Sequence, residues 1–116
     1  MRIKEPTKEM DCEDAIKCIF NLNERDIQIF KKLRETGEIN ASDLAKKVGK
    51  ERSTVYRSLQ KLEKCGMCVK ETKTLDRGGY YHIYKCSQTE KIKNKAKKCL
   101  NQWHQDMIKK IEMLNQ

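Results

Sequence analysis

Residues 41–66 decide the fold and read ASDLAKKVGKERSTVYRSLQKLEKCG. Ala45, Gly49 and Val55 stand at spacings of four and six residues, at which two short helices pack closely around a tight turn. A small residue is needed where the helices cross, and glycine suits a turn residue with a positive φ angle. The stretch therefore predicts a helix-turn-helix whose second helix covers about residues 51–65. Apolar side chains fill the inner face of both helices: Leu44, Val48, Leu59 and Leu62.

Two further helices are predicted before this motif. Residues 11–22 carry apolar side chains at helical spacing. A second helix should begin at Asn23, a good N-cap residue, and end at Gly37, a residue type that often follows a helix. The link 38–40 is compatible with one small strand. Residues 1–10 lack periodicity and contain the only proline, so they are predicted to form a flexible arm.

The periodicity changes after Gly66. Residues 67–72 and 80–86 are rich in valine, tyrosine and isoleucine, and Asp76-Arg77-Gly78-Gly79 lies between them, which predicts a β-hairpin. Ser87 and Glu90 match a capping box, so a long helix is expected to follow to about Leu114. The fold class is therefore mainly α with a small β-hairpin. It is a winged helix-turn-helix at 23–86, flanked by the N-terminal helix 11–22 and a long C-terminal helix within 87–116.

The formal net charge is +9, and the excess of basic groups lies in the later part of the chain. Residues 1–49 carry ten basic and ten acidic groups, residues 50–85 nine and four, and residues 86–116 seven and three. Basic charge confined to one part of a small domain is typical of a surface that binds a polyanion, most often nucleic acid. Solvated lysines that keep the protein soluble explain the charge equally well.

Composition and motifs also exclude some classes of protein. No apolar run approaches the roughly 20 residues that span a bilayer, and the N-terminus lacks the apolar segment of a signal peptide. We therefore expect a cytoplasmic protein with no membrane partner, whose six cysteines are not disulfide-bonded. No paired carboxylates, nucleophile–base spacing or phosphate-binding loop stands out, so we expect no enzyme. No cofactor and no small-molecule effector is identifiable.

A helical wheel of residues 51–65 separates a core face from a contact face. With Val55 inward, Arg57 and Gln60 point outward, where arginine can bind guanine and glutamine can pair with adenine in a major groove. Basic residues near the helix ends suit phosphates, and the hairpin tip at about 73–79 suits a minor groove. An ordinary amphipathic helix with a solvated outer face is the alternative. The predicted DNA-binding residues are Arg52, Ser53, Thr54, Tyr56, Arg57, Gln60, Lys61, Lys64, Lys73 and Arg77.

The long C-terminal helix carries an apolar stripe that so small a domain cannot cover completely. We expect a homodimer in which the stripe packs against helix 11–22 of a partner, because its steps are not a clean heptad. Such a dimer presents two reading helices about 34 Å apart, so its DNA site should be an inverted repeat. The alternative is that the stripe folds onto its own domain. The predicted dimerisation residues are Ile16, Ile19, Phe20, Ile92, Ala96, Cys99, Trp103, Met107, Ile111 and Leu114.

Cys65-Gly66-Met67-Cys68 forms a CxxC motif, and Cys86 lies at the far end of the hairpin. A zinc site needs four converging ligands, and the usual second CxxC is missing. We therefore interpret these cysteines as structural thiols and expect no metal. Metal binding by Cys65, Cys68 and Cys86, or redox sensing, is the alternative. His82, on a predicted strand, is also interpreted as structural.

Three quoted stretches together resemble a known family. They are STVYRSLQKL at 53–62, then Gly66, Met67 and Val69, and then GYYHIY at 79–84, and they are similar to the DNA-binding domain of the archaeal TrmB-like regulators. These regulators belong to the wider MarR-like winged-helix group, and the resemblance covers about residues 23–86. It implies a sequence-specific transcriptional regulator that binds operators with the Arg52–Lys64 helix and the Arg77 wing.

The resemblance does not extend to sugar sensing. Sugar-responsive members of the family add a C-terminal effector domain, so we expect a short form without one. A second class of function remains open, because winged helices also serve as protein-binding modules in the transcription machinery. That alternative predicts weak, salt-insensitive DNA binding and an acidic or apolar outer face.

Overall fold

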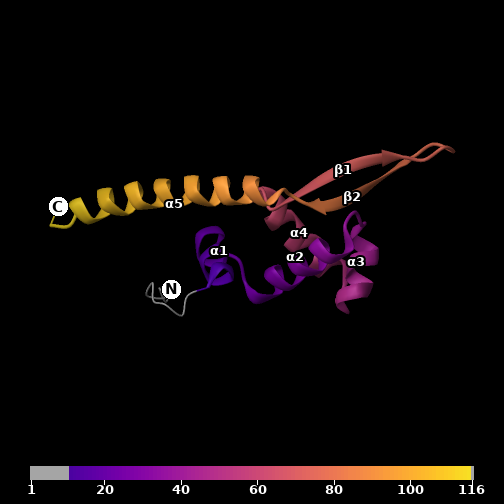
Figure 1. Ribbon diagram of the computed structural model, residues 1–116, viewed down its shortest axis with the longest axis horizontal. Coiled ribbons are helices and arrows are strands. Elements are labelled where there is room, and N and C mark those ends of the chain that lie inside the picture. The colour runs from indigo at the N-terminus through magenta and orange to yellow at the C-terminus, as the bar shows by residue number, and fades with distance from the viewer. Residues whose placement is uncertain (1–10, 116) are drawn as a thin grey trace.

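The computed structural model describes residues 11–115, so the predicted arm at 1–10 lies outside the described residues. The elements follow in the order α1 (Cys12–Phe20), α2 (Glu24–Thr36), α3 (Ala41–Val48), α4 (Arg52–Lys64), β1 (Cys68–Thr74), β2 (Tyr80–Cys86) and α5 (Thr89–Glu112). Figure 1 shows α2, α3 and α4 gathered in a small body from which the hairpin and α5 extend in opposite directions. The predicted fold class, mainly α with a small β-hairpin, is confirmed.

The first three helices begin where the sequence favours a start. Asp11, Asn23 and Asn40 each accept a hydrogen bond of 2.8 Å from the backbone N–H three residues later. In α2 the Asp26 carboxylate also accepts a bond of 3.0 Å from the Asn23 backbone N–H, which completes a capping box. Reciprocal bonds of this kind satisfy donors that the helix itself leaves unpaired.

The predicted capping box of α5, however, is wrong. The N-cap is Gln88, and no side chain caps this helix. Ser87 follows β2 directly, and its backbone N–H donates to the carbonyl of Met67 at 3.0 Å, which ties it to the root of the hairpin and not to α5. The helix therefore begins one residue later than the sequence pattern indicates.

The core lies between α2, α3, α4 and the root of the hairpin. Val55, Leu59 and Leu62 are fully buried, as the helical wheel predicts, and Ile29 and Leu33 of α2 are equally buried. Each such side chain contributes about 1.5–3 kcal/mol when it leaves water. This packing fixes the inner face of α4 and leaves its other face outside the body.

The turn between α3 and α4 depends on Gly49. Its φ angle is +67°, in the left-handed region that glycine adopts at little cost, and its backbone N–H donates to the carbonyl of Ala45. The positive φ angle expected at this glycine is confirmed. The turn directs the start of α4 away from α3 and so sets the crossing of the two helices.

The hairpin strands pair antiparallel, with Cys68 opposite Cys86 at the root and Thr74 opposite Tyr80 near the tip. β1 runs two residues further than expected, so the connecting turn is Leu75–Gly79 and is closed by a hydrogen bond of 3.1 Å between the ends of that segment. Ile39 adds a single bridge to Tyr84, with backbone bonds of 3.1 and 2.8 Å. The small strand expected at 38–40 is thus present as one bridge.

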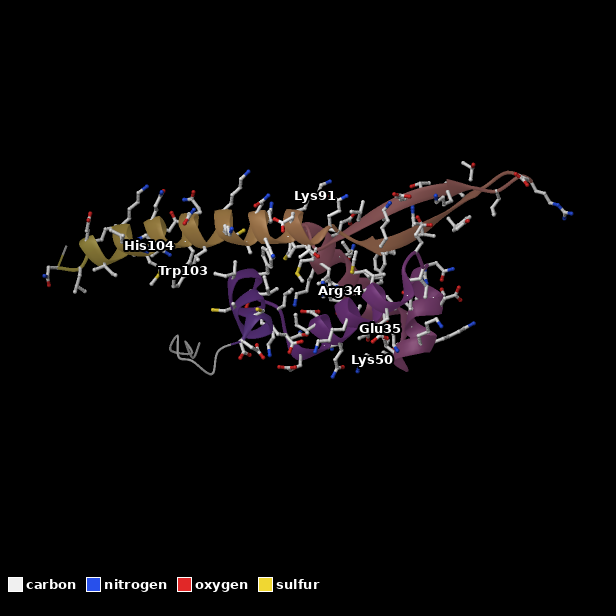
Figure 2. All side chains as sticks on the ribbon, viewed as in Figure 1. Arg34, Glu35, Lys50, Lys91, Trp103 and His104 are labelled. Carbon is white, nitrogen blue, oxygen red and sulfur yellow. The ribbon has the colours of Figure 1, made fainter. Side chains whose placement is uncertain are left out.

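Helix α5 contacts α1 of its own chain and then extends past it (Figure 1). Ile92, in its first turn, packs against the core together with Ile16 and Phe20 of α1. The part of the apolar stripe nearest the hairpin therefore folds onto its own domain. Trp103 and His104 lie on the part that extends further (Figure 2). No helix within residues 11–115 is long and apolar enough to cross a membrane.

Candidate nucleic-acid interface

The outer face of α4 carries most of the predicted DNA-binding residues. Thr54 and Lys61 are half-buried, and the other predicted residues of this helix are exposed: Arg52, Ser53, Tyr56, Arg57, Gln60 and Lys64. Towards the end of the helix a shallow depression is lined by Arg57, Gln60, Lys61, Glu63 and Lys64. In the described part of the chain no ion pair engages Arg52, Arg57 or Lys64. Their charges are therefore available to a partner.

A buried carboxylate of α2 is hydrogen-bonded to the core-facing side of α4. Asp26 has 0% of its surface exposed, yet it lies among apolar core residues. Its two oxygens accept hydrogen bonds from Ser58 Oγ at 2.6 Å, from Lys61 Nζ and from the Asn23 backbone N–H at 3.0 Å. A buried charge is tolerated only when it is paired and hydrogen-bonded, and this one meets both conditions. The network links the start of α2 to the middle of α4.

Electrostatics favour the charged form of this carboxyl group. Burial by itself raises the pKa of Asp26, but the hydrogen bonds from Lys61, Ser58 and Asn23 outweigh it. The pKa therefore lies below its ordinary value of 3.8. Asp26 was not among the residues predicted for the site, although it positions Ser58 and Lys61 of α4.

Lys61 consequently has a different position from that expected of a phosphate ligand. Its ammonium group forms an ion pair with Asp26, although 44% of the side chain remains exposed. The lysine lies at the border between the core and the outer face of α4. Among the basic residues predicted near the helix ends, Arg52 and Lys64 are the ones directed to solvent.

The hairpin places its two predicted DNA-binding residues in different surroundings. Arg77 lies in the exposed turn beside Gly78 and Gly79, which both have positive φ angles. Lys73 lies further down β1, where its Nζ is 3.5 Å from a carboxylate oxygen of Glu71. Arg77 is therefore free at the tip, whereas Lys73 is partly neutralised by an acidic neighbour.

Tyr84 joins the root of the hairpin to α4. It is buried in the core cluster, and burial raises the pKa of its hydroxyl group, with a further contribution from the nearby Tyr56 phenol. The Arg52 guanidinium group acts on the same hydroxyl in the opposite direction. Glu63, near the other end of α4, also raises the pKa, so the root of the hairpin adjoins α4 along its length.

The cysteines of the CxxC motif face separate backbone carbonyls. Cys65 Sγ donates to Phe20 O at 3.9 Å, Cys68 Sγ to Leu59 O at 3.6 Å, and Cys86 Sγ to Phe30 O at 4.0 Å. Burial raises the pKa of Cys68 to about 12 and also raises the pKa values of Cys65 and Cys86. A raised pKa disfavours the thiolate, which is the form that binds metals and attacks oxidants. Within residues 11–115 no three His, Cys, Asp or Glu residues form a group that could hold a metal ion.

We expect replacement of Cys65 and Cys68 by alanine to leave metal content and DNA binding little changed. The buried thiol of Cys68 fills space beside Leu59, so the variant should lose about 1–2 kcal/mol of stability through packing alone. Elemental analysis of the purified protein and a binding titration check this together. Stoichiometric zinc or iron in the wild type that disappears in the variant would contradict the structural interpretation.

Comparison with known proteins agrees with this geometry. The model of the sugar-specific transcriptional regulator family TrmB matches residues 16–90. A possible transcriptional regulator from Methanosarcina mazei is 29% identical, covers 98% of this chain and 97% of its own, and superposes with a TM-score of 0.76. An uncharacterized protein of Methanocaldococcus jannaschii is 30% identical over 102 residues, which are 88% of this chain and 84% of that relative.

The same fold also occurs in a more distant protein. The multiple antibiotic-resistance repressor MarR of Listeria monocytogenes has a TM-score of 0.52 at 21% identity, over 89% of this chain and 68% of its own. That likeness concerns the fold alone. Family and fold are those of transcriptional regulators, and more than half of this chain matches the family model. The chain belongs to the TrmB family and is a winged-helix transcriptional regulator.

Proposed function

We propose that this regulator binds double-stranded DNA sequence-specifically, with α4 in the major groove and the hairpin tip on the minor groove. One observation carries the proposal: one face of α4 is packed into the core, and the opposite face exposes side chains that can contact bases. Val55, Leu59 and Asp26 fix its position, while Arg57 and Gln60 point outward. Direct readout requires side chains held in register by a rigid support, and this helix supplies both.

The exposed side chains of α4 fall into two groups: those that can contact base edges and those that can contact phosphates. Arg57 has the planar fork that binds the O6 and N7 atoms of guanine, and Gln60 has the amide that pairs with adenine. Arg52 and Lys64, nearer the two ends of the helix, carry charges that suit phosphates. Ser53, Thr54 and Tyr56 can add hydroxyl contacts at the same end as Arg52.

We further propose that the protein acts as a homodimer on an inverted-repeat operator. α5 has 24 residues and is about 36 Å long, so its distal part extends well beyond the body. Trp103 is 49% exposed and Ile111 is 64% exposed, and Leu100 and Ile108 are exposed on the same helix. A second copy would cover this apolar surface, together with the half-buried Ala96, Cys99 and Met107.

Dimerisation on this surface uses only part of the predicted residue set. Ile16, Phe20 and Ile92 already pack against the core of their own chain, and Ile19 is half-buried. The contact between subunits should therefore centre on the distal residues Trp103, Met107, Ile111 and Leu114.

Two substitutions on α4 test the DNA-binding proposal. Arg57→Ala should lower the affinity for an operator by about 1–3 kcal/mol and relax the base preference, because a bidentate contact to a base is lost. Lys64→Ala should weaken all sequences alike and reduce the slope of log K against log salt by about 1. The measurement is a titration of each variant against a duplex selected from a random pool by the wild type and against a scrambled duplex.

The result can also favour the second class of function. Unchanged specificity in Arg57→Ala would contradict the assignment of α4 as the reading helix. Weak, salt-insensitive binding of every duplex by the wild type would instead favour a protein-binding module. Glu63, within the α4 depression, would then be part of the contact surface.

A further inference from the structure

The two faces of the hairpin have different chemistry. Side chains alternate between the faces of a strand, so the register divides the hairpin into two sets. The inner face carries, from root to tip, Cys68, Cys86, Lys70, Tyr84, Thr72, His82, Thr74 and Tyr80. The outer face carries Val69, Lys85, Glu71, Ile83, Lys73 and Tyr81.

The inner face is the one that looks towards the helices. Cys68 and Tyr84 belong to the core cluster at the root of the hairpin, and Cys86 packs against it. Tyr84 also lies near α4, where Tyr56, Glu63 and Arg52 act on its hydroxyl group. Following the same face outward, the hairpin leaves the body (Figure 1), and its next pairs are exposed to solvent. The root of the inner face therefore packs beside α4, and the rest of this face extends outward from there.

Beyond the exposed Lys70, the inner face towards the tip carries uncharged hydrogen-bonding side chains. Thr72 Oγ1 and His82 Nδ1 lie 3.1 Å apart, across the strand pair. The rings of His82 and Tyr80 are in contact, with centroids 5.6 Å apart and planes inclined at 58°. Tyr80 is nevertheless 68% exposed. Tyr80 therefore presents both its ring and its hydroxyl group to solvent beside His82, where a partner can reach them.

The outer face of the hairpin differs from the inner face in carrying an acidic group. Glu71 lies at its centre, with Lys85 Nζ 2.6 Å and Lys73 Nζ 3.5 Å from its carboxylate oxygens. This single carboxylate offsets part of the positive charge of the two lysines and would itself repel a phosphate, whereas the inner face carries Lys70 and no acidic partner for it. The described residues of the inner face include no acidic group.

We propose that the inner face of the hairpin, through Thr72, His82 and Tyr80, binds the sugar-phosphate backbone of the DNA that α4 reads. This inference rests on the proposed function and adds a second contact surface to it. In this proposal the Thr72 hydroxyl donates to His82 Nδ1, which leaves the imidazole proton on Nε2. Nε2 and the Tyr80 hydroxyl then donate to phosphate oxygens.

The spacing of the donors matches such a backbone. Residues two apart on one strand lie about 6.7 Å apart, which is close to the separation of successive phosphates along one strand of B-DNA. His82 and Tyr80 can therefore contact neighbouring phosphates, and Arg77 lies beyond them at the tip. The wing would contact DNA along its side as well as through its turn.

Matched substitutions on the two faces test the inference. Tyr80→Phe and His82→Ala should each weaken DNA binding about threefold to tenfold, as expected for the loss of one hydrogen bond to a charged acceptor. The loss should be equal for the selected and the scrambled duplex, because phosphates carry no sequence information. The salt slope should stay unchanged, because neutral donors release no counterions. Tyr81→Phe, the adjacent substitution on the outer face, should leave the affinity unchanged.

The readouts separate this inference from the proposed function. Circular dichroism and the urea midpoint show first that each variant is folded as the wild type is. Equal affinities for Tyr80→Phe, His82→Ala and the wild type, with Arg57→Ala still impaired, would overturn the inference and leave the function standing. A comparable loss in Tyr81→Phe would also overturn it, since both faces would then matter equally. A wild type that binds neither duplex would remove the proposed function as well.

Discussion

Replacing Asp26 by alanine is expected to lower the free energy of unfolding by about 2–4 kcal/mol, because the buried Ser58 hydroxyl loses its acceptor and the α2 capping box is broken. Lys61, which is partly exposed, can turn its ammonium group to solvent and adds less to the loss. Urea unfolding followed by circular dichroism measures the effect. Asp43→Ala is the matched control, because Asp43 occupies the same third position of α3 but is exposed. It should change stability by no more than about 0.5 kcal/mol.

The same carboxylate makes stability depend on acid. Because the pKa of Asp26 is lower in the folded protein than its ordinary value of 3.8, its stabilising contribution is fully present above that value. The contribution is lost as the pH falls through the lower, folded pKa. The stability difference between the wild type and Asp26→Asn should therefore shrink between neutral pH and about pH 2. A constant difference over this range, or equal losses for Asp26→Ala and Asp43→Ala, would contradict the role assigned to the network.

Trp103→Glu is expected to have the largest effect on DNA binding of any substitution outside α4. A charge is costly to bury within the apolar stripe of α5, so the dimer should dissociate. The two half-sites would then be bound separately, and the affinity for an inverted repeat should fall about 100-fold or more through lost bivalency. Light scattering and footprinting on the same samples measure mass and protected length together. The α4 surface is untouched, so binding to a single half-site should remain.

Gln105→Glu is the matched control for this variant. Gln105 lies two residues further along α5, so it is exposed on the side of the helix opposite Trp103, off the apolar stripe. It introduces the same charge on the same helix and should leave both mass and operator affinity nearly unchanged. The dimer proposal fails if the wild type is a monomer that protects one half-site.

The helical part of the fold could be predicted because its signals are local. Asn23 and Asn40 cap helices, Gly49 ends one, and the spacing of Val55 and Leu59 identifies the buried face of α4. Each of these features depends on residues within one or two turns, so a single sequence is enough to reveal it. The start of α5 was misplaced for the opposite reason: Ser87 is held by Met67, which lies just before β1 and is distant in the sequence.

The candidate site was predicted less completely, because it depends on contacts between distant parts of the chain. The Asp26–Ser58 bond joins residues from α2 and α4, and nothing near Asp26 in the sequence indicates its burial. One signal was present: Ser58 falls on the core face of α4, and a buried hydroxyl needs a partner. The two faces of the hairpin were equally hidden, because a shift of one residue in the register would exchange them.

The junction between the hairpin and α5 has a mechanical consequence. Only Ser87 and Gln88 separate β2 from α5, and Ser87 is itself bonded to Met67. A Cβ atom on Gly66 would lie 3.6 Å from the side chain of Lys95, so the end of α4 abuts the same joint. Because this linker is short and hydrogen-bonded, a change in the direction of α5 should also change the direction of the strands. In a dimer that is held together through α5, the angle between the subunits and the tilt of each hairpin would therefore change together.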